Sequence, residues 1–363
     1  MSNQRDPPFI DCLETSMSSA LVINDNNGIN DYHTLKKRKS KNNAEEGVDN
    51  GSVDVSVTIK DMTDLPDSCA SQVETLAKHV WHSGWRALPH HALPLWMQDN
   101  EYLLSGYRPP LPSVRACLAS VFRMHTETIN IWTHLLGALI FVCWFANFLL
   151  LPSDSIPPKS KPVITTFFIG AISCLICSTI FHIFSCHSVR VSKLFNKIDY
   201  CGISLLVVGS FIPWLYYAFH CRFTEKLVYL ILLCVLGVVC ISVSFIDKFG
   251  EPAYRSTRAG LFVVFGLCAV VPCGHHMIIF GVSSSFKHAS ITWLILMGFL
   301  YISGALLYAN RIPERFFPGK FDILGQSHQI FHVLVVMAAA VHYYGIMTLA
   351  MNHHLLCPLN QMK

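Results

Sequence analysis

Residues 227–246 read LVYLILLCVLGVVCISVSFI, a run of 20 residues without one charged side chain. About 20 apolar residues in a helix are needed to cross the roughly 30 Å of hydrocarbon in a bilayer. Helix is the expected structure, because each backbone N–H and C=O group in lipid must find its partner within the segment. This stretch therefore predicts a membrane-spanning helix.

Six further apolar segments of similar length lie on either side of this one. The seven predicted spans occupy residues 129–151, 163–186, 198–219, 227–246, 258–280, 290–309 and 325–350. The composition agrees, since 52% of the 363 residues are hydrophobic and only 14% are charged. We therefore predict an all-α membrane protein, a seven-transmembrane helix bundle.

The rest of the chain divides around this membrane domain. Residues 1–66 are polar and poor in aromatic side chains, a composition that predicts a disordered tail. Residues 67–128 form a predicted juxtamembrane segment, in which positions 68–87 have the spacing of a short amphipathic helix. The membrane domain covers 129–350, and 351–363 form a C-terminal tail.

Loop charges predict the orientation of the bundle. Seven spans put the termini on opposite sides, and cytoplasmic loops are enriched in Lys and Arg. With the N-terminus inside, the inner side carries 11 such residues and the outer side 6. The inner set is Arg115, Arg123, Arg190, Lys193, Lys197, Lys248, Arg255, Arg258, Arg311, Arg315 and Lys320, and the outer set is Lys159, Lys161, Arg222, Lys226, Lys287 and Lys363. We expect a multi-pass plasma-membrane protein with a cytoplasmic N-terminus and an extracellular C-terminus.

The small net charge of +4 gives no indication of a nucleic-acid partner.

Polar side chains within the spans are costly and need a partner or a function. His182 ends the second predicted span, one helical turn after Ser178, and Asp199 opens the third. His328 and His332 open the seventh, four residues apart on one helix face. The second span runs inward, whereas the third and seventh run outward. All five side chains are therefore expected at a similar depth on the cytoplasmic side.

Three imidazoles and a carboxylate suit Zn²⁺. We predict a zinc site of His182, His328, His332 and Asp199, in which Asp199 either binds the ion or holds a water as general base. Ser178 is the candidate hydrogen-bond donor to a developing oxyanion. The simpler interpretation is that an HxxxH pair makes only interhelical hydrogen bonds. A site closed by four protein ligands would brace the helices without chemistry, so structural and catalytic roles both stay open.

The remaining histidines near the spans are interpreted as packing residues. They are His125 and His134 at the entry of the first span, His275 and His276 in the outer half of the fifth, and His342 ten residues beyond the HxxxH pair.

Longer strings carry a resemblance to a known family. They are DNEYLL at 99–104, RMHTETINIWTHLLG at 123–137, KIDYCGISLL at 197–206, GSFIPWLYY at 209–217, RIPERFFPGKFDI at 311–323 and SHQIFHVLVV at 327–336. Over about residues 95–350 the chain resembles the adiponectin receptors of the PAQR (progestin and adipoQ receptor) family. The resemblance implies seven transmembrane helices with a cytoplasmic N-terminus. It also implies a zinc site at the four residues named above, with Ser178 as the motif serine.

The resemblance implies a function as well. The adiponectin receptors are similar to alkaline ceramidases in this constellation, and are associated with ceramide hydrolysis and with fatty-acid and glucose metabolism. We therefore expect an adiponectin-receptor-like protein whose zinc site hydrolyses ceramide to sphingosine and fatty acid. Its expected partners are membrane lipid, an extracellular adiponectin-like hormone and a second copy of the chain. The alternative is a non-catalytic receptor or membrane-fluidity regulator in which zinc is structural, so enzymatic activity stays open.

Overall fold

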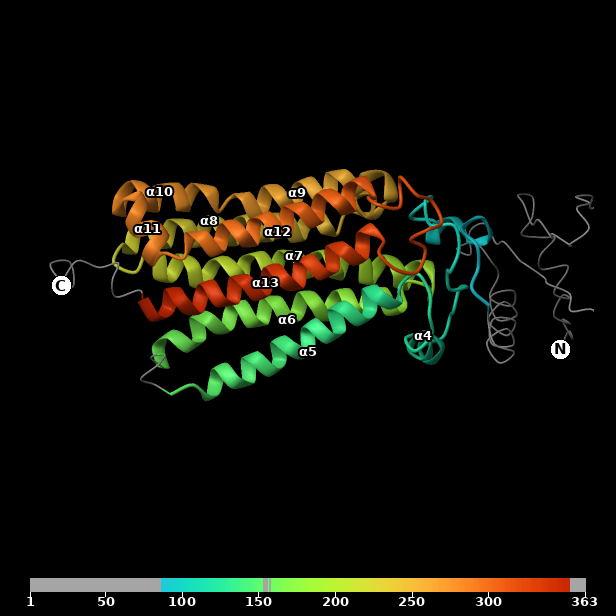
Figure 1. Cartoon of the computed structure of the whole chain (residues 1–363), viewed down its shortest axis with the longest axis horizontal. Helices are drawn as coiled ribbons and strands as arrows, with labels where there is room; N and C mark the ends of the chain where they lie inside the picture. Colours follow the sequence, from blue (N-terminus) through green and yellow to red (C-terminus); the bar gives the residue numbers. More distant parts are fainter. Residues whose placement is uncertain (1–85, 153–155, 157, 353–363) are drawn as a thin grey trace, which may run out of the picture.

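A computed structural model of the chain describes residues 86–152, 156 and 158–352. Seven spans within these residues are long and apolar enough to cross a bilayer, and they run side by side along the long axis (Figure 1). They are α5 (Thr128–Leu150), α6 (Lys161–Phe184), α7 (Val189–Ala218), α8 (Phe223–Ser244), α9 followed by α10 (Arg255–Leu267 and Val270–Phe280), α12 (Ile291–Asn310) and α13 (Ser327–Asn352). The predicted seven-helix, all-α fold is confirmed. The predicted disordered tail, the amphipathic helix except its last two residues, and most of the C-terminal tail lie outside the described residues.

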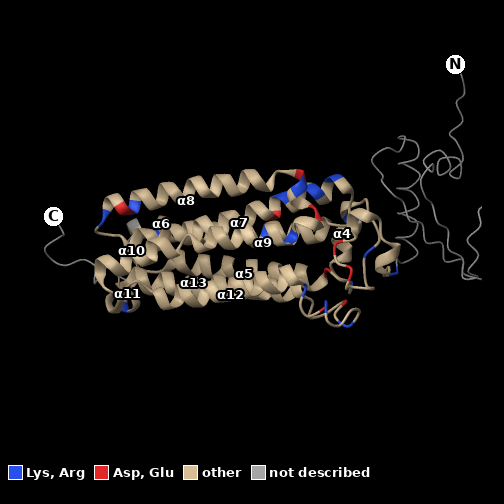
Figure 2. Ribbon diagram, turned by 90° about the horizontal axis from the view of Figure 1, so that it is seen from above, with Lys and Arg blue, Asp and Glu red and all other residues tan. Residues whose placement is uncertain are grey.

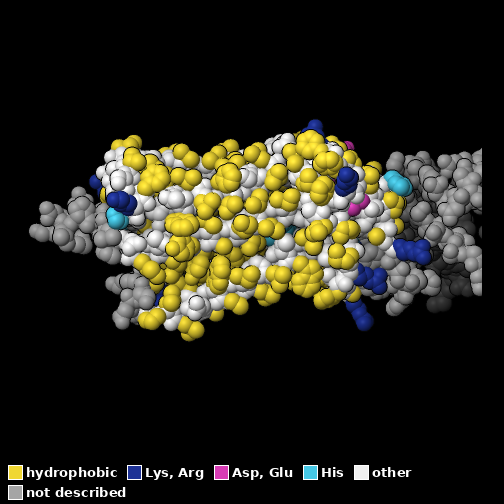
Figure 3. Space-filling view, in the orientation of Figure 1, with side chains coloured by type: hydrophobic (Ala, Val, Ile, Leu, Met, Phe, Trp, Pro, Cys, Tyr) yellow, Lys and Arg dark blue, Asp and Glu magenta, His cyan; other side chains and the backbone are white. Residues whose placement is uncertain are grey.

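The sides of the bundle are apolar, as a lipid-facing surface requires. Large hydrophobic side chains cover the face seen in Figure 3, and Lys and Arg lie towards the two ends of the bundle (Figure 2). Leu139 on α5, Val235 on α8 and Ile278 on α10 are among the exposed apolar residues. Because these side chains would be unfavourable in water, their continuous cover indicates a belt in contact with lipid.

Helix α7 begins at Val189 rather than at residue 198, where apolarity had placed its start. The Ser188 hydroxyl caps the helix by accepting a hydrogen bond from the Val191 backbone N–H. The polar residues between this cap and residue 198 are helical, but they precede the apolar run. Hydrophobicity therefore marked the part of the helix that lies in lipid, whereas a cap residue marks where the helix starts.

The fifth span is broken, which the sequence prediction did not include. Helix α9 ends at Leu267 and α10 begins at Val270. Pro272 explains where the helix breaks. A proline ring has no N–H and collides with the carbonyl four residues earlier, which here is that of Cys268. A short further helix, α11 (Val282–His288), follows α10 where a loop had been expected.

Helices α6 and α7 cross at very short range. A Cβ atom added at Gly170 on α6 would lie 2.5 Å from the Leu205 carbonyl oxygen, and one at Gly209 on α7 would lie 2.5 Å from that of Thr166. Glycine therefore lets the two backbones touch, as small residues do in membrane helix pairs. Because α6 carries His182 and α7 carries Asp199, this crossing sets the spacing of the candidate site.

Residues 86–127, here called the cap segment, cover one end of the bundle. The segment contains two short 3₁₀ turns, η2 (His90–Ala92) and η3 (Leu95–Met97), and helix α4 (Val114–Ser120). The Asp322 carboxylate, in the loop between α12 and α13, accepts hydrogen bonds from the Leu104 and Ser105 backbones at 2.9 Å. The buried Glu314 carboxylate in the same loop accepts one from Asn100 at 3.1 Å. The cap segment is thus fastened to the end of the bundle at which α6 ends and α13 begins (Figure 1).

Candidate metal centre

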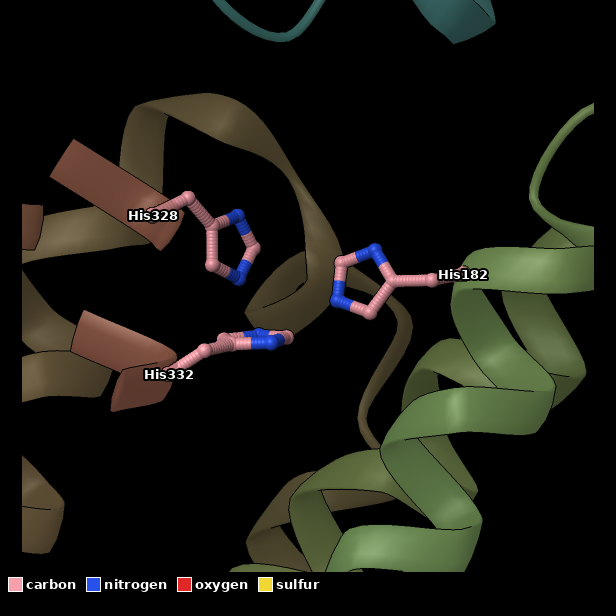
Figure 4. Close-up of side chains that lie close together, drawn as sticks. All are labelled: His182, His328 and His332. Carbon is pink, nitrogen blue, oxygen red and sulfur yellow. The ribbon is translucent and has the colours of Figure 1, made fainter. Parts of the chain in front are cut away.

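Three histidines converge at the end of the bundle beneath the cap segment. His182 lies in the last turn of α6, and His328 and His332 lie in the first two turns of α13. Their ligand atoms all fall within 4.8 Å of one another, and Figure 4 shows the two α13 rings facing the ring from α6. His182 and His332 are each only 2% exposed, so bulk solvent does not reach their rings. The predicted meeting of these three residues is confirmed.

The start of α13 is held by a buried carboxylate. Glu314 accepts hydrogen bonds from both the backbone N–H and the hydroxyl of Ser327, the first residue of the helix. A negative group at this position also suits the positive end of the helix dipole. Gln329 adds a hydrogen bond from its side-chain amide to the Ile323 carbonyl at 2.8 Å. These contacts fix the helical turn that carries His328 and His332.

The ring of His182 has one nitrogen paired and one unpaired. Its Nδ1 lies 2.7 Å from Oε2 of Glu127, the residue just before α5. An ionised carboxylate only accepts hydrogen bonds, so Nδ1 carries the hydrogen and Nε2 keeps its lone pair. That Nε2 atom is buried without a hydrogen-bond partner among the described residues. A buried nitrogen lone pair beside two further imidazoles is the arrangement that a metal ion satisfies.

Burial alone would raise the pKa of the Glu127 carboxyl. The hydrogen bond from His182 and the nearby His328 imidazole outweigh burial and hold this pKa below its usual range. The side-chain amide of Asn130 adds a hydrogen bond to the same carboxylate at 2.8 Å. Glu127 is therefore ionised at neutral pH and acts as an acceptor.

His332 is oriented in the same way as His182. Its Nδ1 donates to the Asn130 backbone carbonyl at 3.1 Å, which leaves Nε2 for a metal. The His134 ring stacks flat on the His332 ring, with centroids 3.6 Å apart and planes 7° from parallel. His328 is supported on its other side by the Tyr308 ring at 5.0 Å, and the Arg255 guanidinium lies over that tyrosine. All three candidate ligands are thus held by neighbouring side chains or backbone.

Ser178 and Asp199 lie beside the three histidines. Ser178 is buried one turn before His182 on α6 and lies close to the Asp199 carboxylate on α7. Asp199 is also close enough to His182 for an electrostatic interaction. The close group of ligand atoms consists of the three histidines, without Asp199. The serine and the aspartate therefore form a pair at its edge.

The end of α6 is held by a buried arginine from the cap segment. The Arg108 guanidinium is 2% exposed and donates to the backbone carbonyls of His182 and Ile183. It also donates to the Ser120 hydroxyl on α4 at 2.9 Å. Since the last carbonyls of a helix lack partners within it, Arg108 satisfies them and fixes the backbone of a candidate ligand.

The start of α5 makes contacts with the site that were not predicted from the sequence. His134 was predicted only to pack, and no role was predicted for Glu127 or Asn130, yet all three contact candidate ligands. A signal was present, because these residues stand at positions i, i+3 and i+7 and so share one helix face. The packing interpretation agrees with the contacts of His275 and His276, which hydrogen-bond Tyr229 and Ser285 at 2.8 Å. His342 likewise hydrogen-bonds the Ser210 carbonyl, at 2.9 Å.

These features define a class: a seven-helix membrane protein with a braced histidine cluster at one end of the bundle. Comparison with known proteins narrows the class, since the model of the haemolysin-III-related family matches residues 122–343. The chain belongs to this family, and its predicted resemblance to the adiponectin receptors of the PAQR family is confirmed.

Three relatives illustrate the likeness. An adiponectin receptor protein of Drosophila melanogaster is 54% identical over 291 residues, which cover 80% of this chain and 66% of that protein. Progestin and adipoQ receptor-like protein 1 of Caenorhabditis elegans is 50% identical over 290 residues, covering 79% of this chain and 66% of the relative. Heptahelical transmembrane protein 4 of Arabidopsis thaliana is 33% identical over 344 residues, covering 73% and 89%. The chain therefore spans about two thirds of the length of its animal relatives.

Proposed function

We propose that this protein binds zinc through His182, His328 and His332 and hydrolyses the amide bond of ceramide to give sphingosine and a fatty acid. The observation that carries the proposal is the buried Nε2 of His182, which has no hydrogen-bond partner among the described residues and faces two further imidazoles. Imidazole nitrogens are ligands that suit zinc. Catalytic zinc sites commonly have three protein ligands, and these three histidines would supply that number.

Zinc held by His182, His328 and His332 would supply Lewis-acid chemistry for a water molecule and an amide carbonyl. Asp199 then acts as the general base that takes a proton from the attacking water and passes it to the leaving amine. Ser178 lies beside Asp199, so its first role is to orient that carboxylate. Its predicted role at the oxyanion would require the hydroxyl to turn towards the substrate carbonyl during the reaction. The site lies at the end of the spans, near the level of lipid head groups and their amide bonds.

The test is hydrolysis by the purified full-length chain in lipid nanodiscs that contain ceramide. The wild-type protein should carry about one zinc per chain and release sphingosine and fatty acid in equal amounts. A His328→Ala variant should lose zinc and turnover, whereas Asp199→Asn should keep zinc and lose most turnover. Turnover by wild type no greater than that of His328→Ala would exclude this activity.

A structural role for zinc is the second candidate, and the amount of bracing around the ligands favours it. His182 and His332 come from different helices, and both are fixed by residues at the start of α5. A metal at this point would join α6 to α13, with α5 bracing both ligand helices, in a receptor or membrane-fluidity regulator without chemistry. In that case removal of zinc would lower stability, while the zinc-loaded protein would release no product from ceramide.

We further propose a plasma-membrane protein with the histidine cluster on the cytoplasmic side. Cys221, just beyond the opposite end of α7, is disulfide-bonded, whereas the other described cysteines are free. Disulfides persist in oxidising compartments, which supports an extracellular position for that end. The name of the Drosophila relative suggests a hormone of the adiponectin type as ligand on this outer side. A tag at either end, probed by antibody in intact and permeabilised cells, tests the orientation.

A further inference from the structure

We propose that Glu127 is the positioning residue of the metal centre, holding the His182 ring with Nε2 towards the ion, and that Asn130 extends this control to His332. The inference rests on the proposed zinc site and adds a function for the start of α5. Neither residue is a candidate ligand. Each acts through a histidine that is one.

The contact between Glu127 and His182 selects one of two neutral forms of the ring. A free imidazole can carry its hydrogen on either nitrogen. With a carboxylate oxygen 2.7 Å from Nδ1, the hydrogen must sit on Nδ1, and the Nε2 lone pair then points towards His328 and His332. A carboxylate behind a histidine also makes the other ring nitrogen a stronger donor to a metal.

Asn130 connects this contact to the second ligand helix. Its side-chain amide donates to the same Glu127 oxygen at 2.8 Å, while its backbone carbonyl accepts from Nδ1 of His332 at 3.1 Å. Glu127 and Asn130 are three residues apart, so one turn of α5 contacts a ligand from α6 and a ligand from α13. The register of α5 therefore sets the orientation of both rings together.

A purely structural pairing of Glu127 with His182 would not explain why the Nε2 atom of the His182 ring lacks a partner among the described residues. Such a pair would explain the bonded Nδ1, but it would leave Nε2 buried and unpaired beside two imidazoles. Buried polar atoms are normally paired, and unpaired ones need an explanation. A carboxylate behind the ring and an unpaired nitrogen in front of it together correspond to the carboxylate–histidine–metal arrangement.

The test measures zinc affinity of the full-length protein in detergent by competition with a chromophoric chelator. Loss of such an outer partner typically weakens metal binding by about 10- to 100-fold, and this is the effect expected for Glu127→Ala. Glu127→Gln keeps an acceptor oxygen without the charge, so a smaller loss is expected. The matched control is Glu101→Ala, which removes an exposed carboxylate that pairs with Arg311 and touches no candidate ligand.

A second measurement separates positioning from general loss of structure. Cobalt(II) in place of zinc gives a visible spectrum that depends on the geometry of the ligands. This spectrum should change in Glu127→Ala and stay as in wild type in the control. Should Glu127→Ala fail to fold, Asn130→Ala offers a second route, because it removes the amide that holds the carboxylate but keeps the backbone carbonyl that His332 uses.

The outcomes distinguish this inference from the function on which it rests. Zinc affinity in Glu127→Ala within twofold of wild type would overturn the positioning role and leave the zinc site intact. A wild-type chain that binds no zinc would overturn the proposed function and, with it, this inference. A 10-fold or larger loss, confined to the Glu127 and Asn130 variants, is the result that we expect.

Discussion

Replacing Gly209 by alanine should force apart the two helices that carry the candidate catalytic pair. The new Cβ atom would lie 2.5 Å from the Thr166 carbonyl oxygen and 3.3 Å from the Gly170 Cα. Both are backbone atoms, so no side chain can rotate to make room. Ordinary contact begins near 3.4 Å, and α6 and α7 must therefore separate locally by roughly 0.9 Å, the difference between the two distances.

Overpacking of this kind typically costs about 1–3 kcal/mol of unfolding free energy. For a domain of this size each kcal/mol corresponds to about 2–4 °C in melting temperature, so a fall of about 2–12 °C is expected. The matched control is Gly260→Ala on α9, where nothing lies within 4 Å of the added Cβ. That change should leave stability unchanged or raise it by up to about 1 kcal/mol, because alanine favours helix more than glycine does.

The assay is the fraction of monodisperse protein that remains in detergent after heating, followed by size-exclusion chromatography. Gly209→Ala should melt well below wild type and Gly260→Ala at or slightly above it. If the two variants melt within about 1 °C of each other, close backbone contact between α6 and α7 is not what stabilises the bundle. In that case the crossing would not set the spacing of Ser178 and Asp199 either.

Three further predictions concern the end of the bundle beneath the cap segment. A strong chelator should lower the melting temperature of wild type but not of His182→Ala, since a metal at 100 times its dissociation constant stabilises by about 2.7 kcal/mol. Arg108→Lys should cost at least about 2 kcal/mol in thermal unfolding, because a single ammonium cannot satisfy the separate carbonyls and hydroxyls that the guanidinium reaches. Burial, with a smaller effect of Arg108, lowers the pKa of His125 to about 3 despite the opposing Glu127 carboxylate. A depressed histidine pKa leaves stability unchanged above about pH 6.5 and removes it as the pH falls towards 3, so His125 alone should account for a loss of about 2 kcal/mol of unfolding free energy between pH 7.5 and pH 5. Denaturation at a series of pH values tests this, and a His125→Gln variant that keeps the full slope would contradict it.

The spans were predictable because lipid imposes one rule on each segment separately. A run such as 227–246 must be helical, and α8 (Phe223–Ser244) is where that run had placed it. The features that were not predicted depend on individual residues and not on the hydrophobicity of a segment. The polar start of α7 depends on the Ser188 cap, and the break between α9 and α10 depends on Pro272, whose effect apolarity does not register.

The histidine cluster was partly predictable for a similar reason. Topology alone puts the end of the second span and the start of the seventh at one depth, so His182, His328 and His332 were expected to meet. The depth of a residue in the membrane does not determine which face of its helix points into the bundle. The contacts of Glu127 and His134 were therefore not predicted. Nor does depth show that Ser178 lies beside Asp199.

The sequence by itself thus determined that the chain crosses the membrane seven times and that three of its histidines lie at one end of the bundle. These properties follow from the transfer of each segment into lipid, a local quantity that composition and spacing record. Only the tertiary structure decided which nitrogen of the His182 ring is bonded and which is left unpaired. That choice depends on hydrogen bonds between α5, α6 and α13, residues up to about 200 positions apart, whose geometry arises only when the helices pack.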